Sequence, residues 1–400
     1  MSRKPHQCGF FPVMSAMKKP VYLDYAAATP TDPRVIKAMV DCLSIEGTFA
    51  NPHAKDHVYG WEAAEAVETA RSEVAALIGV SPLEITFTSG ATESNNLAIF
   101  GLARGLREKG DTRRHIITSA IEHKAILEAC AELEKEGYKV TYLTPAPDGT
   151  VDVNLLEQYF DEDVFLVSIA QANSVLGSVT DIHALAAFCK KYGVFFHTDT
   201  AQSAGYVTTD FANSDVSMAS LTSEKVCGPK GAGALYVKRS DGVPLAACIF
   251  GGGQERGLRG GTVATHEVVG MGRAFEILRL EGKKDAKRMN ELRNRLIEGL
   301  SSLPGIIFNG SKEHHVPGIL SVSFTGIEGR KLLPSLKDVA CSTGSACASA
   351  DLKPSYILTG IGLPDDVARA SLRLSLGRFT TAEEIDRAIT DITNAVMKLQ

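Results

Sequence analysis

The sequence lacks a long apolar run, an excess of positive charge and paired cysteine motifs. No stretch of its 400 residues reaches the ~18 apolar residues that cross a bilayer, which excludes a membrane-spanning protein. Asp and Glu number 47 against 42 Lys and Arg, so the net charge of -5 argues against direct nucleic-acid binding, which needs a basic surface. The 44% hydrophobic and 22% charged content is ordinary for globular proteins and excludes wholesale disorder.

The eight cysteines form none of the C-x-x-C pairs that are typical of zinc or thioredoxin-like sites. A chain of this length does not need disulfides, so we expect a reducing, cytoplasmic location with mostly buried thiols. Cys130 and Cys189 fall within amphipathic helical stretches, which is typical of buried thiols. The histidines and acidic residues have no metal-ligand spacing, so no metal site is predicted.

Residues 1–19 are expected to form a flexible N-terminal extension. The first part carries Arg3 and Lys4 and no acidic residue, so a targeting peptide is the alternative. Its apolar stretch is short and is followed by no small-residue cleavage pattern, which favours the extension.

Short apolar runs alternate with amphipathic helical stretches through the middle of the chain. The runs are continuously apolar rather than alternating, which predicts parallel strands covered on both faces. Repeated strand–helix–strand units predict a doubly wound α/β domain whose ligand site lies at the carboxyl ends of the strands. The predicted strands are 84–89, 115–120, 139–144, 164–170, 193–199, 217–222 and 233–239.

A glycine-rich break at 250–262 is followed by a long helical region at about 263–303. The remainder combines two strand-like segments with a final amphipathic helix at 381–399 and predicts a smaller α+β domain. We therefore divide the chain into a large domain, 33–278, and a small domain formed by 20–32 and 279–400.

Three residues at predicted strand ends could carry chemistry. The strand at 84–89 runs into Gly90 and a helix, an arrangement that can bind an anion, although a helix N-cap by Thr92 is the simpler alternative. Asp199 could bond a protonated ring nitrogen or merely cap a loop. Lys225 could form a Schiff base or be a solvated surface charge.

Three further residues could have either a functional or an ordinary structural role. His123 starts a helix just past a strand, where it could make local bonds or act as a base. Cys347 lies on a Gly/Ser/Ala-rich segment, where a thiol can be reactive. Arg373 lies in a strand-like alternation and could bind a substrate carboxylate or be a paired surface arginine.

Taken together and in this order, these segments resemble the pyridoxal-phosphate (PLP) cysteine desulfurases of the class V aminotransferase superfamily. The resemblance implies an α/β, fold-type I PLP-dependent transferase with a large, mostly parallel sheet domain and a smaller α+β domain. The matching stretches are LDYAAATP (23–30), FTSGATESNNLAI (87–99), IEHKAIL (121–127), HTDTAQSAG (197–205), EKVCGPKGAGALYV (224–237), ERGLRGGT (255–262), TGSACAS (343–349) and SLRLSLGRFT (371–380).

The resemblance also implies a role for each matched residue. Lys225 would hold PLP as a Schiff base, and Cys347 would take sulfur from L-cysteine as a persulfide, releasing L-alanine. His123 would stack on the ring and move protons, and Arg373 would bind the substrate carboxylate. The other implied contacts are Asp199 to the ring nitrogen, Gln202 near the ring hydroxyl, Ala91, Thr92 and Thr222 to the phosphate, Thr262 to the phosphate from the partner subunit of a homodimer, and Asn173 and Ser174 to the substrate.

Two positions depart from the family's pattern. Glu224 stands where the family has a phosphate-binding histidine, and a carboxylate beside a phosphate costs about 4 kcal/mol per charge pair at ~4 Å and a dielectric near 20. Ser174 replaces the second of two asparagines and is short enough to need a bridging water. We expect weakened PLP affinity or altered substrate handling.

The leading hypothesis is a cysteine desulfurase that passes persulfide sulfur to an acceptor protein. Selenocysteine lyase would use the same site, and a transaminase would have no use for Cys347. A non-catalytic paralogue that acts as a scaffold in a sulfur-transfer complex is the alternative from another class, because Glu224 and Ser174 weaken the pattern. The sequence does not identify the acceptor, since iron–sulfur assembly, tRNA thiolation and DNA sulfur modification would use the same donor chemistry.

Overall fold

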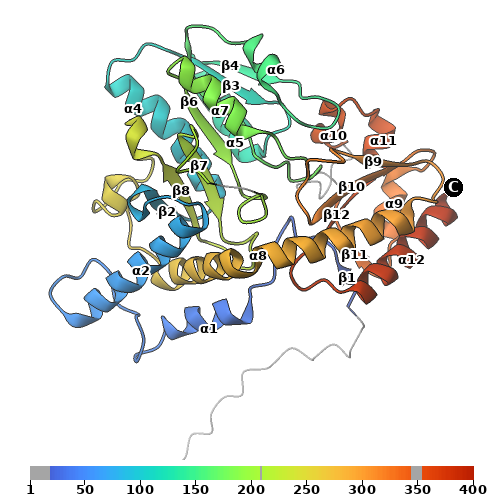
Figure 1. The fold of residues 1–400 in the computed structure, drawn as a ribbon, viewed down its shortest axis with the longest axis horizontal. Helices are drawn as coiled ribbons and strands as arrows, with labels where there is room; N and C mark the ends of the chain where they lie inside the picture. The colour runs from blue at the N-terminus through green and yellow to red at the C-terminus, as the bar shows by residue number, and fades with distance from the viewer. Residues whose placement is uncertain (1–18, 208–209, 344–353) are drawn as a thin grey trace, which may run out of the picture.

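The computed structural model describes residues 19–207, 210–343 and 354–400 (Figure 1). The predicted N-terminal extension up to residue 18 and the predicted nucleophile Cys347 lie outside the described residues. No helix in the described ranges is long and apolar enough to cross a membrane.

A seven-stranded sheet forms the larger part of the molecule, with the strand order β2-β8-β7-β6-β5-β3-β4. Every predicted strand is present, and the sheet is mostly parallel as predicted, with β8 antiparallel to both of its neighbours. Residues 223–232, which join β7 to β8, contain no helix, so they cannot make the crossover that a parallel pair needs. The strands are β2 (Ile85–Thr88), β3 (His115–Ser119), β4 (Lys139–Leu143), β5 (Val164–Ser168), β6 (Phe195–Asp199), β7 (Met218–Thr222) and β8 (Gly233–Val237).

Helices cover both faces of this sheet, which explains its continuously apolar strands. Neighbouring residues point to opposite cores: Ile116 packs with α4 and α5, whereas Ile117 belongs to the core beneath α2, α7 and α8. The helices around the sheet are α1 (Pro33–Asp41), α2 (Val58–Leu77), α3 (Ala91–Asn96), α4 (Leu102–Glu108), α5 (Lys124–Lys135), α6 (Val153–Glu157), α7 (Ile182–Lys191) and α8 (Thr265–Leu300), and a π-helical turn, Leu97–Gly101, joins α3 to α4.

The smaller part has its own antiparallel sheet, β12-β10-β9, and its own core. The N-terminal strand β1 pairs with β11 of this part, although the two are far apart in sequence. The elements are β1 (Val21–Tyr22), β9 (Ile306–Asn309), β10 (Ile319–Phe324), α9 (Gly329–Ser335), β11 (Val339–Ala340), α10 (Tyr356–Gly360), α11 (Asp365–Arg369), β12 (Ser371–Ser375) and α12 (Ala382–Leu399).

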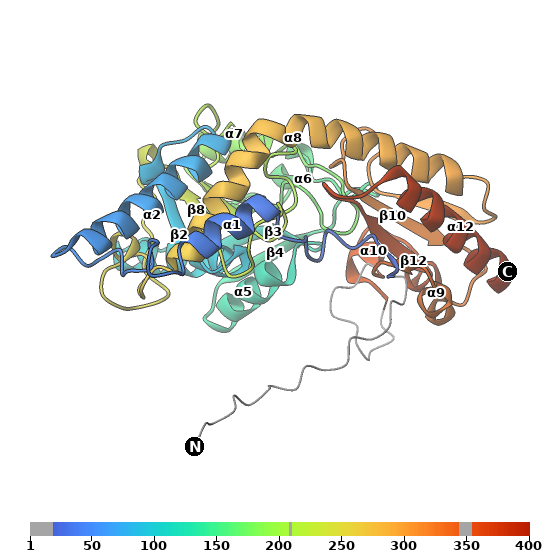
Figure 2. The same ribbon diagram turned by 90° about the horizontal axis from the view of Figure 1, so that it is seen from below.

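The long helix α8 belongs to both parts (Figure 2). Its Phe275 and Leu278 pack in the core of the large sheet, whereas Leu292 and Leu296 pack in the small core. We propose that the domain boundary after residue 278 lies within this continuous helix, with no linker between the parts.

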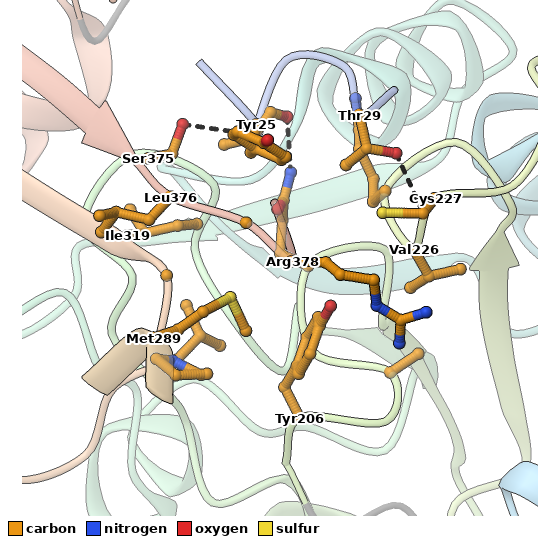
Figure 3. A pocket seen from close by; sticks show the side chains of 18 of the residues that line it. Tyr25, Thr29, Tyr206, Val226, Cys227, Met289, Ile319, Ser375, Leu376 and Arg378 are labelled. Carbon is orange, nitrogen blue, oxygen red and sulfur yellow. Dashed lines mark hydrogen bonds between the residues drawn. The ribbon is translucent and has the colours of Figure 1, made fainter. Parts of the chain in front are cut away.

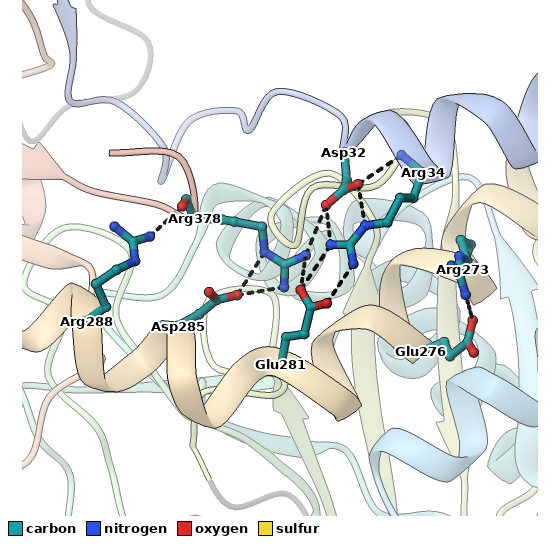
Figure 4. A network of polar contacts seen from close by, with 8 residues as sticks. All are labelled: Asp32, Arg34, Arg273, Glu276, Glu281, Asp285, Arg288 and Arg378. Atoms are coloured by element: carbon teal, nitrogen blue, oxygen red, sulfur yellow. Dashed lines mark hydrogen bonds and ion pairs between the residues drawn. The ribbon is translucent and has the colours of Figure 1, made fainter. Parts of the chain in front are cut away.

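Ion pairs stabilise the junction between the large and the small part of the molecule (Figure 4). Arg378, just after β12, lies 2.7 Å from Asp285 of α8 and 3.1 Å from Asp32, which caps α1. Arg34 joins the same Asp32 to Glu281 of α8. The side chains of Asp32 and Arg378 are almost fully buried, and the bonds from Arg34 and Arg378 hold the pKa of Asp32 well below its usual range.

Candidate active site

A cavity of about 480 Å³ lies at the carboxyl ends of the strands of the large sheet, where a doubly wound fold places its ligand. It brings together side chains from the ends of five strands, β2, β3, β5, β6 and β7, and from β12 of the small part. Glu224 also lines it. The predicted residues in its wall are Ala91, Thr92, His123, Asn173, Ser174, Asp199, Gln202, Thr222, Lys225 and Arg373.

One end of the cavity is formed by the start of α3. Gly90, and not Thr92, occupies the N-cap position, and no side chain caps the helix, so the capping alternative for Thr92 was wrong. Gly90 has φ of 149°, and a Cβ on Gly233 of the adjacent β8 would lie 2.5 Å from its Cα, so both positions need glycine. The N–H groups of the first turn have no acceptor within the helix, which leaves them available to an anion.

Lys225 lies three residues after β7 and projects into the cavity. Its Nζ is 3.1 Å from Oε1 of Glu224 and donates to the carbonyl of Ala27. The backbone N–H and the hydroxyl of Thr29 both donate to the Glu224 carbonyl, so the N-terminal segment holds this turn. The carboxylate in the position of the expected histidine therefore pairs with the lysine.

Asp199 ends β6 and is buried in the cavity wall. Its Oδ1 accepts the N–H of Ala201 at 2.9 Å, as a loop cap would, and its Oδ2 accepts Nδ2 of Asn95 at 2.8 Å. Asn95 was missed as a functional residue, although it lies in the matched stretch 87–99. A fully buried asparagine that holds a buried carboxylate positions that carboxylate for a ligand.

His197 lies two residues before Asp199 and was also missed. Its two ring nitrogens bond the hydroxyls of Ser168 and Ser220 at 2.8 and 3.0 Å. Burial lowers the pKa of His197 to about 4, so the ring is neutral and does not neutralise Asp199.

His123 is the N-cap of α5, and its Nδ1 accepts the N–H of Ala125 at 3.2 Å. The local bond that the sequence allowed is therefore present, and the ring also lines the cavity. On another side, Nε2 of Gln202 donates to the carbonyl of Ala26 at 3.0 Å.

Arg373 closes the cavity from the small part and is only 3% exposed, so its interpretation as a surface arginine was wrong. It lies 2.8 Å from Asp24 and donates to the Ser174 carbonyl at 3.1 Å. Its Nε is buried and has no partner among the described residues. A buried guanidinium with a spare donor suits a small anion such as a carboxylate.

The side chain of Asn173 lines the cavity but is engaged in its own turn. Its Oδ1 accepts the N–H groups of Val175 and Leu176, and its Nδ2 donates to the carbonyl of Ile121 at 3.0 Å. One amide hydrogen remains for a ligand. Asn173 thus shapes the turn that presents Ser174.

Among the predicted residues that the structure describes, Thr262 does not line this cavity. It is exposed on the glycine-rich loop. Cys347 lies outside the described residues, but the described chain on either side reaches the site. Ser342 exchanges backbone hydrogen bonds with Arg373, and the Tyr356 hydroxyl donates to the Glu122 carbonyl at 2.7 Å.

A second, small cavity of about 40 Å³ shares part of the Lys225 wall (Figure 3). Tyr206, Cys227 and Arg378 line it, and Met289 of α8 closes one side. Burial raises the pKa of Tyr206 and Cys227, so both are neutral. This cavity connects the lysine turn with the ion pairs at the domain junction.

The donor set of the main cavity fits PLP. Free N–H groups at the start of α3 suit its phosphate, Asp199 suits a protonated ring nitrogen, and Lys225 suits its aldehyde carbon. A Cβ built on Gly90 would meet nothing within 4 Å, so there is open space next to the start of α3. Glu224 and Glu93 are the acidic side chains of this wall that oppose a phosphate, and Glu93 lies 3.0 Å from Arg259 in an ion pair.

Comparisons with known proteins agree with this chemistry. The family model of class-V aminotransferases matches residues 21–388. A cysteine desulfurase IscS of Proteus mirabilis (strain HI4320) is 50% identical over 384 residues, which cover 96% of this chain and 94% of that protein. IscS of Shewanella pealeana (strain ATCC 700345 / ANG-SQ1) is 49% identical with the same coverage.

Solved structures are similar as well. A NifS-like protein has a TM-score of 0.87 at 36% identity and covers 95% of this chain and 100% of its own. A structure described as SspA in complex with cysteine has a TM-score of 0.80 at 36% identity and covers 90% of this chain and 99% of its own. The chain belongs to the PLP-dependent cysteine desulfurases, within the class-V aminotransferase family.

Proposed function

We propose that this protein removes sulfur from L-cysteine, leaving L-alanine and a persulfide on Cys347. The observation that carries the proposal is the single cavity that joins Lys225, Asp199 and His123 with a buried arginine, Arg373. The described chain that leads toward Cys347 departs from Ser342, which is hydrogen-bonded to that arginine.

PLP, when bound, supplies the electron sink that stabilises negative charge on the substrate carbons. Lys225 would bind its aldehyde carbon, and Asp199, held by Asn95, would keep the ring nitrogen protonated. His123 would contact the ring and move protons between the substrate and the solvent. The start of α3 and the hydroxyl of Thr222 would hold the phosphate, and Gln202 would hold the ring hydroxyl.

Arg373 binds the substrate carboxylate through its Nε, which has no partner in the part of the chain that the structure describes, and Ser174 provides a further polar contact. The Cys347 thiolate forms a bond to the substrate sulfur while the bond between that sulfur and the β-carbon breaks. The electron pair of the broken bond goes to the carbon, which takes a proton and becomes the methyl group of alanine. Cys347 then carries the sulfur for transfer to an acceptor protein, which we place in the cytoplasm.

We further propose that the protein is a homodimer. Large apolar side chains are exposed on α1, on α2 and on the segment between them, including Ile45 at 72% and Trp61 at 59%. Phe250, at the start of the loop that carries Thr262, is 77% exposed. An exposed apolar face of this kind marks an interface, and a second copy seated there would bring Thr262 to its partner's phosphate.

The loop that carries Thr262 is anchored firmly. Arg71 of α2 lies 2.7 Å from Glu255 in a buried pair, and the Glu255 carboxylate also accepts the N–H of Phe87 on β2. The ion pair and the hydrogen bond of the Glu255 side chain therefore hold its backbone at a positive φ of 48°. This rigidity supports a role of the loop in the partner's site.

The proposed function is tested by measuring alanine from L-cysteine with a thiol reductant, with and without added PLP. Wild type is expected to form alanine, and the Cys347→Ser variant is expected to form none. Alanine formation that persists without Cys347 would point to another sulfur-removing route. No alanine at saturating PLP would favour the scaffold, and a preference for L-selenocysteine would favour the lyase.

A further inference from the structure

Glu122 is a buried carboxyl group that the roles above do not use. It is 4% exposed, follows β3 and directly precedes His123. Its Oε1 accepts the N–H of Ala170 at 3.0 Å. Ala170 begins the loop after β5 that leads to Asn173, so this bond joins two loops that line the active site.

Two further hydrogen bonds hold the same backbone. Asn173 donates from its side chain to the carbonyl of Ile121 at 3.0 Å, and Tyr356 of α10 donates from its hydroxyl to the carbonyl of Glu122 at 2.7 Å. The peptide that carries His123 is thus held by the β5 loop and by the small part of the molecule. The Glu122 carboxyl is the side-chain bridge in this arrangement.

The second carboxyl oxygen has a different environment. Oε2 is buried and has no partner among the described residues. A cavity of about 10 Å³ adjoins Glu122 and is lined by polar side chains of Ser119, Asn173 and Thr180. That size is close to the minimum for one water molecule, which needs such polar partners. A protonated Oε2 can donate to a water there, whereas an ionised one cannot.

Burial and the neighbouring charged groups oppose the ionisation of Glu122. Burial, and to a smaller extent the negative charge of Asp199 on β6, raises the pKa of Glu122 to about 8. The buried thiol of Cys130 on α5 has its pKa raised to about 12, so it stays neutral. His123 lies next in the chain but directs its Nδ1 to the N–H of Ala125. Glu122 is therefore the neutral acid near pH 7.

We propose that Glu122 is a positioning residue that acts as a neutral carboxylic acid and fixes the spacing between His123 and the Asn173–Ser174 turn. The inference rests on the proposed function, because that function gives His123 and Ser174 their roles. Glu122 itself touches neither substrate nor cofactor.

Glu122→Gln and Glu122→Met separate this role from simple packing. Glutamine keeps an acceptor for Ala170 and a donor for the water, whereas methionine fills the space and provides neither. We expect kcat/KM of the holoenzyme for L-cysteine to fall at least tenfold in Glu122→Met, mainly through kcat, and to stay within about threefold of wild type in Glu122→Gln. Glu122→Asp, which is too short to reach Ala170, serves as a second variant if the methionine variant does not fold.

Two readouts do not depend on turnover. Amide hydrogen exchange at Ala170 should quicken in Glu122→Met and Glu122→Asp but not in Glu122→Gln. The unfolding midpoint of Glu122→Gln minus that of wild type should rise between about pH 5 and pH 8, because only the unfolded wild type ionises Glu122 in that range.

Equal losses in Glu122→Gln and Glu122→Met would overturn the proposal, because a neutral group with the same donor and acceptor would then not replace Glu122. A midpoint difference that is constant with pH would also overturn it, because Glu122 would then ionise over the same pH range in the folded and the unfolded protein. Unchanged kcat/KM and unchanged exchange in Glu122→Met would overturn it as well. If wild type forms no alanine, the proposed function fails, while the exchange and midpoint measurements still decide the role of Glu122.

Discussion

Replacing Glu224 with histidine is expected to tighten PLP binding. The Glu224 carboxylate lies 3.1 Å from Nζ of Lys225 and shares a cavity wall with Thr92 and Thr222. It therefore engages the nitrogen that is proposed to bond the aldehyde carbon of PLP. It also places a negative charge in the wall that is proposed to bind the phosphate.

The expected change in PLP affinity follows from the distance between the two negative charges and from the solvent exposure of the side chains. Two unit charges 4 Å apart interact by about 4 kcal/mol at a dielectric of 20, whereas fully exposed pairs contribute about 0–1 kcal/mol. The side chains of Lys225 and Glu224 are 16% and 32% exposed, so solvent screens part of the interaction. We expect about 1–2 kcal/mol, or a roughly 5- to 30-fold lower Kd for PLP in Glu224→His.

The assay is an absorbance titration of the cofactor-free protein with PLP. Glu224→Gln, which removes the charge without adding a donor that suits a phosphate, is expected to lie between wild type and Glu224→His. Glu313→Gln, which removes an exposed carboxylate outside the cavity, is the matched control and should bind PLP as wild type does. Wild type that keeps full PLP occupancy through dialysis, together with no gain in Glu224→His, would refute the reasoning.

Three further predictions concern other buried charges. Asp199→Asn is expected to lower kcat at least tenfold while a PLP absorbance band is still formed; unchanged kcat in that assay would contradict its role at the ring nitrogen. Asp32→Asn is expected to lower stability more at pH 7 than at pH 2, because a carboxylate with a lowered pKa contributes its full stability above about pH 3.9 and loses it gradually as the pH falls toward its folded-state pKa; urea unfolding at both pH values tests this, and an equal loss at both would contradict it. Glu255→Gln leaves Arg71 without its buried partner and is expected to cost about 3–5 kcal/mol in denaturant unfolding, whereas a loss below 1 kcal/mol would mean that the pair is dispensable.

The sequence predicted the architecture because the strands are buried on both faces. A continuously apolar run does not indicate the direction of its strand, so it could not show that β8 is antiparallel to its neighbours. The direction of β8 follows from the short connection after β7, which is not part of the apolar pattern. The long helix α8 was likewise predicted, but not that it packs in both cores.

The residues that are proposed to carry the chemistry were predicted from motifs, whereas the residues that hold them were not. Some of these partners are far apart in the sequence, and only the folded chain brings them together. The pairs are Asn95 with Asp199, Glu122 with Ala170 and Asp24 with Arg373. A single buried polar residue forms no sequence motif, and nothing near it in the sequence indicates its hydrogen-bond partner. The pairing of Glu224 with the adjacent Lys225 could have been anticipated from their adjacency.

The transfer of sulfur to Cys347 is tested by mass spectrometry of peptides from the protein. Holoenzyme treated with L-cysteine in the absence of reductant is digested, and the peptide that contains Cys347 is compared with the one that contains the buried thiol Cys130. We expect a gain of one sulfur atom on Cys347, none on Cys130 and one alanine released for each sulfur gained. Alanine released in that amount with no sulfur on Cys347 would contradict it.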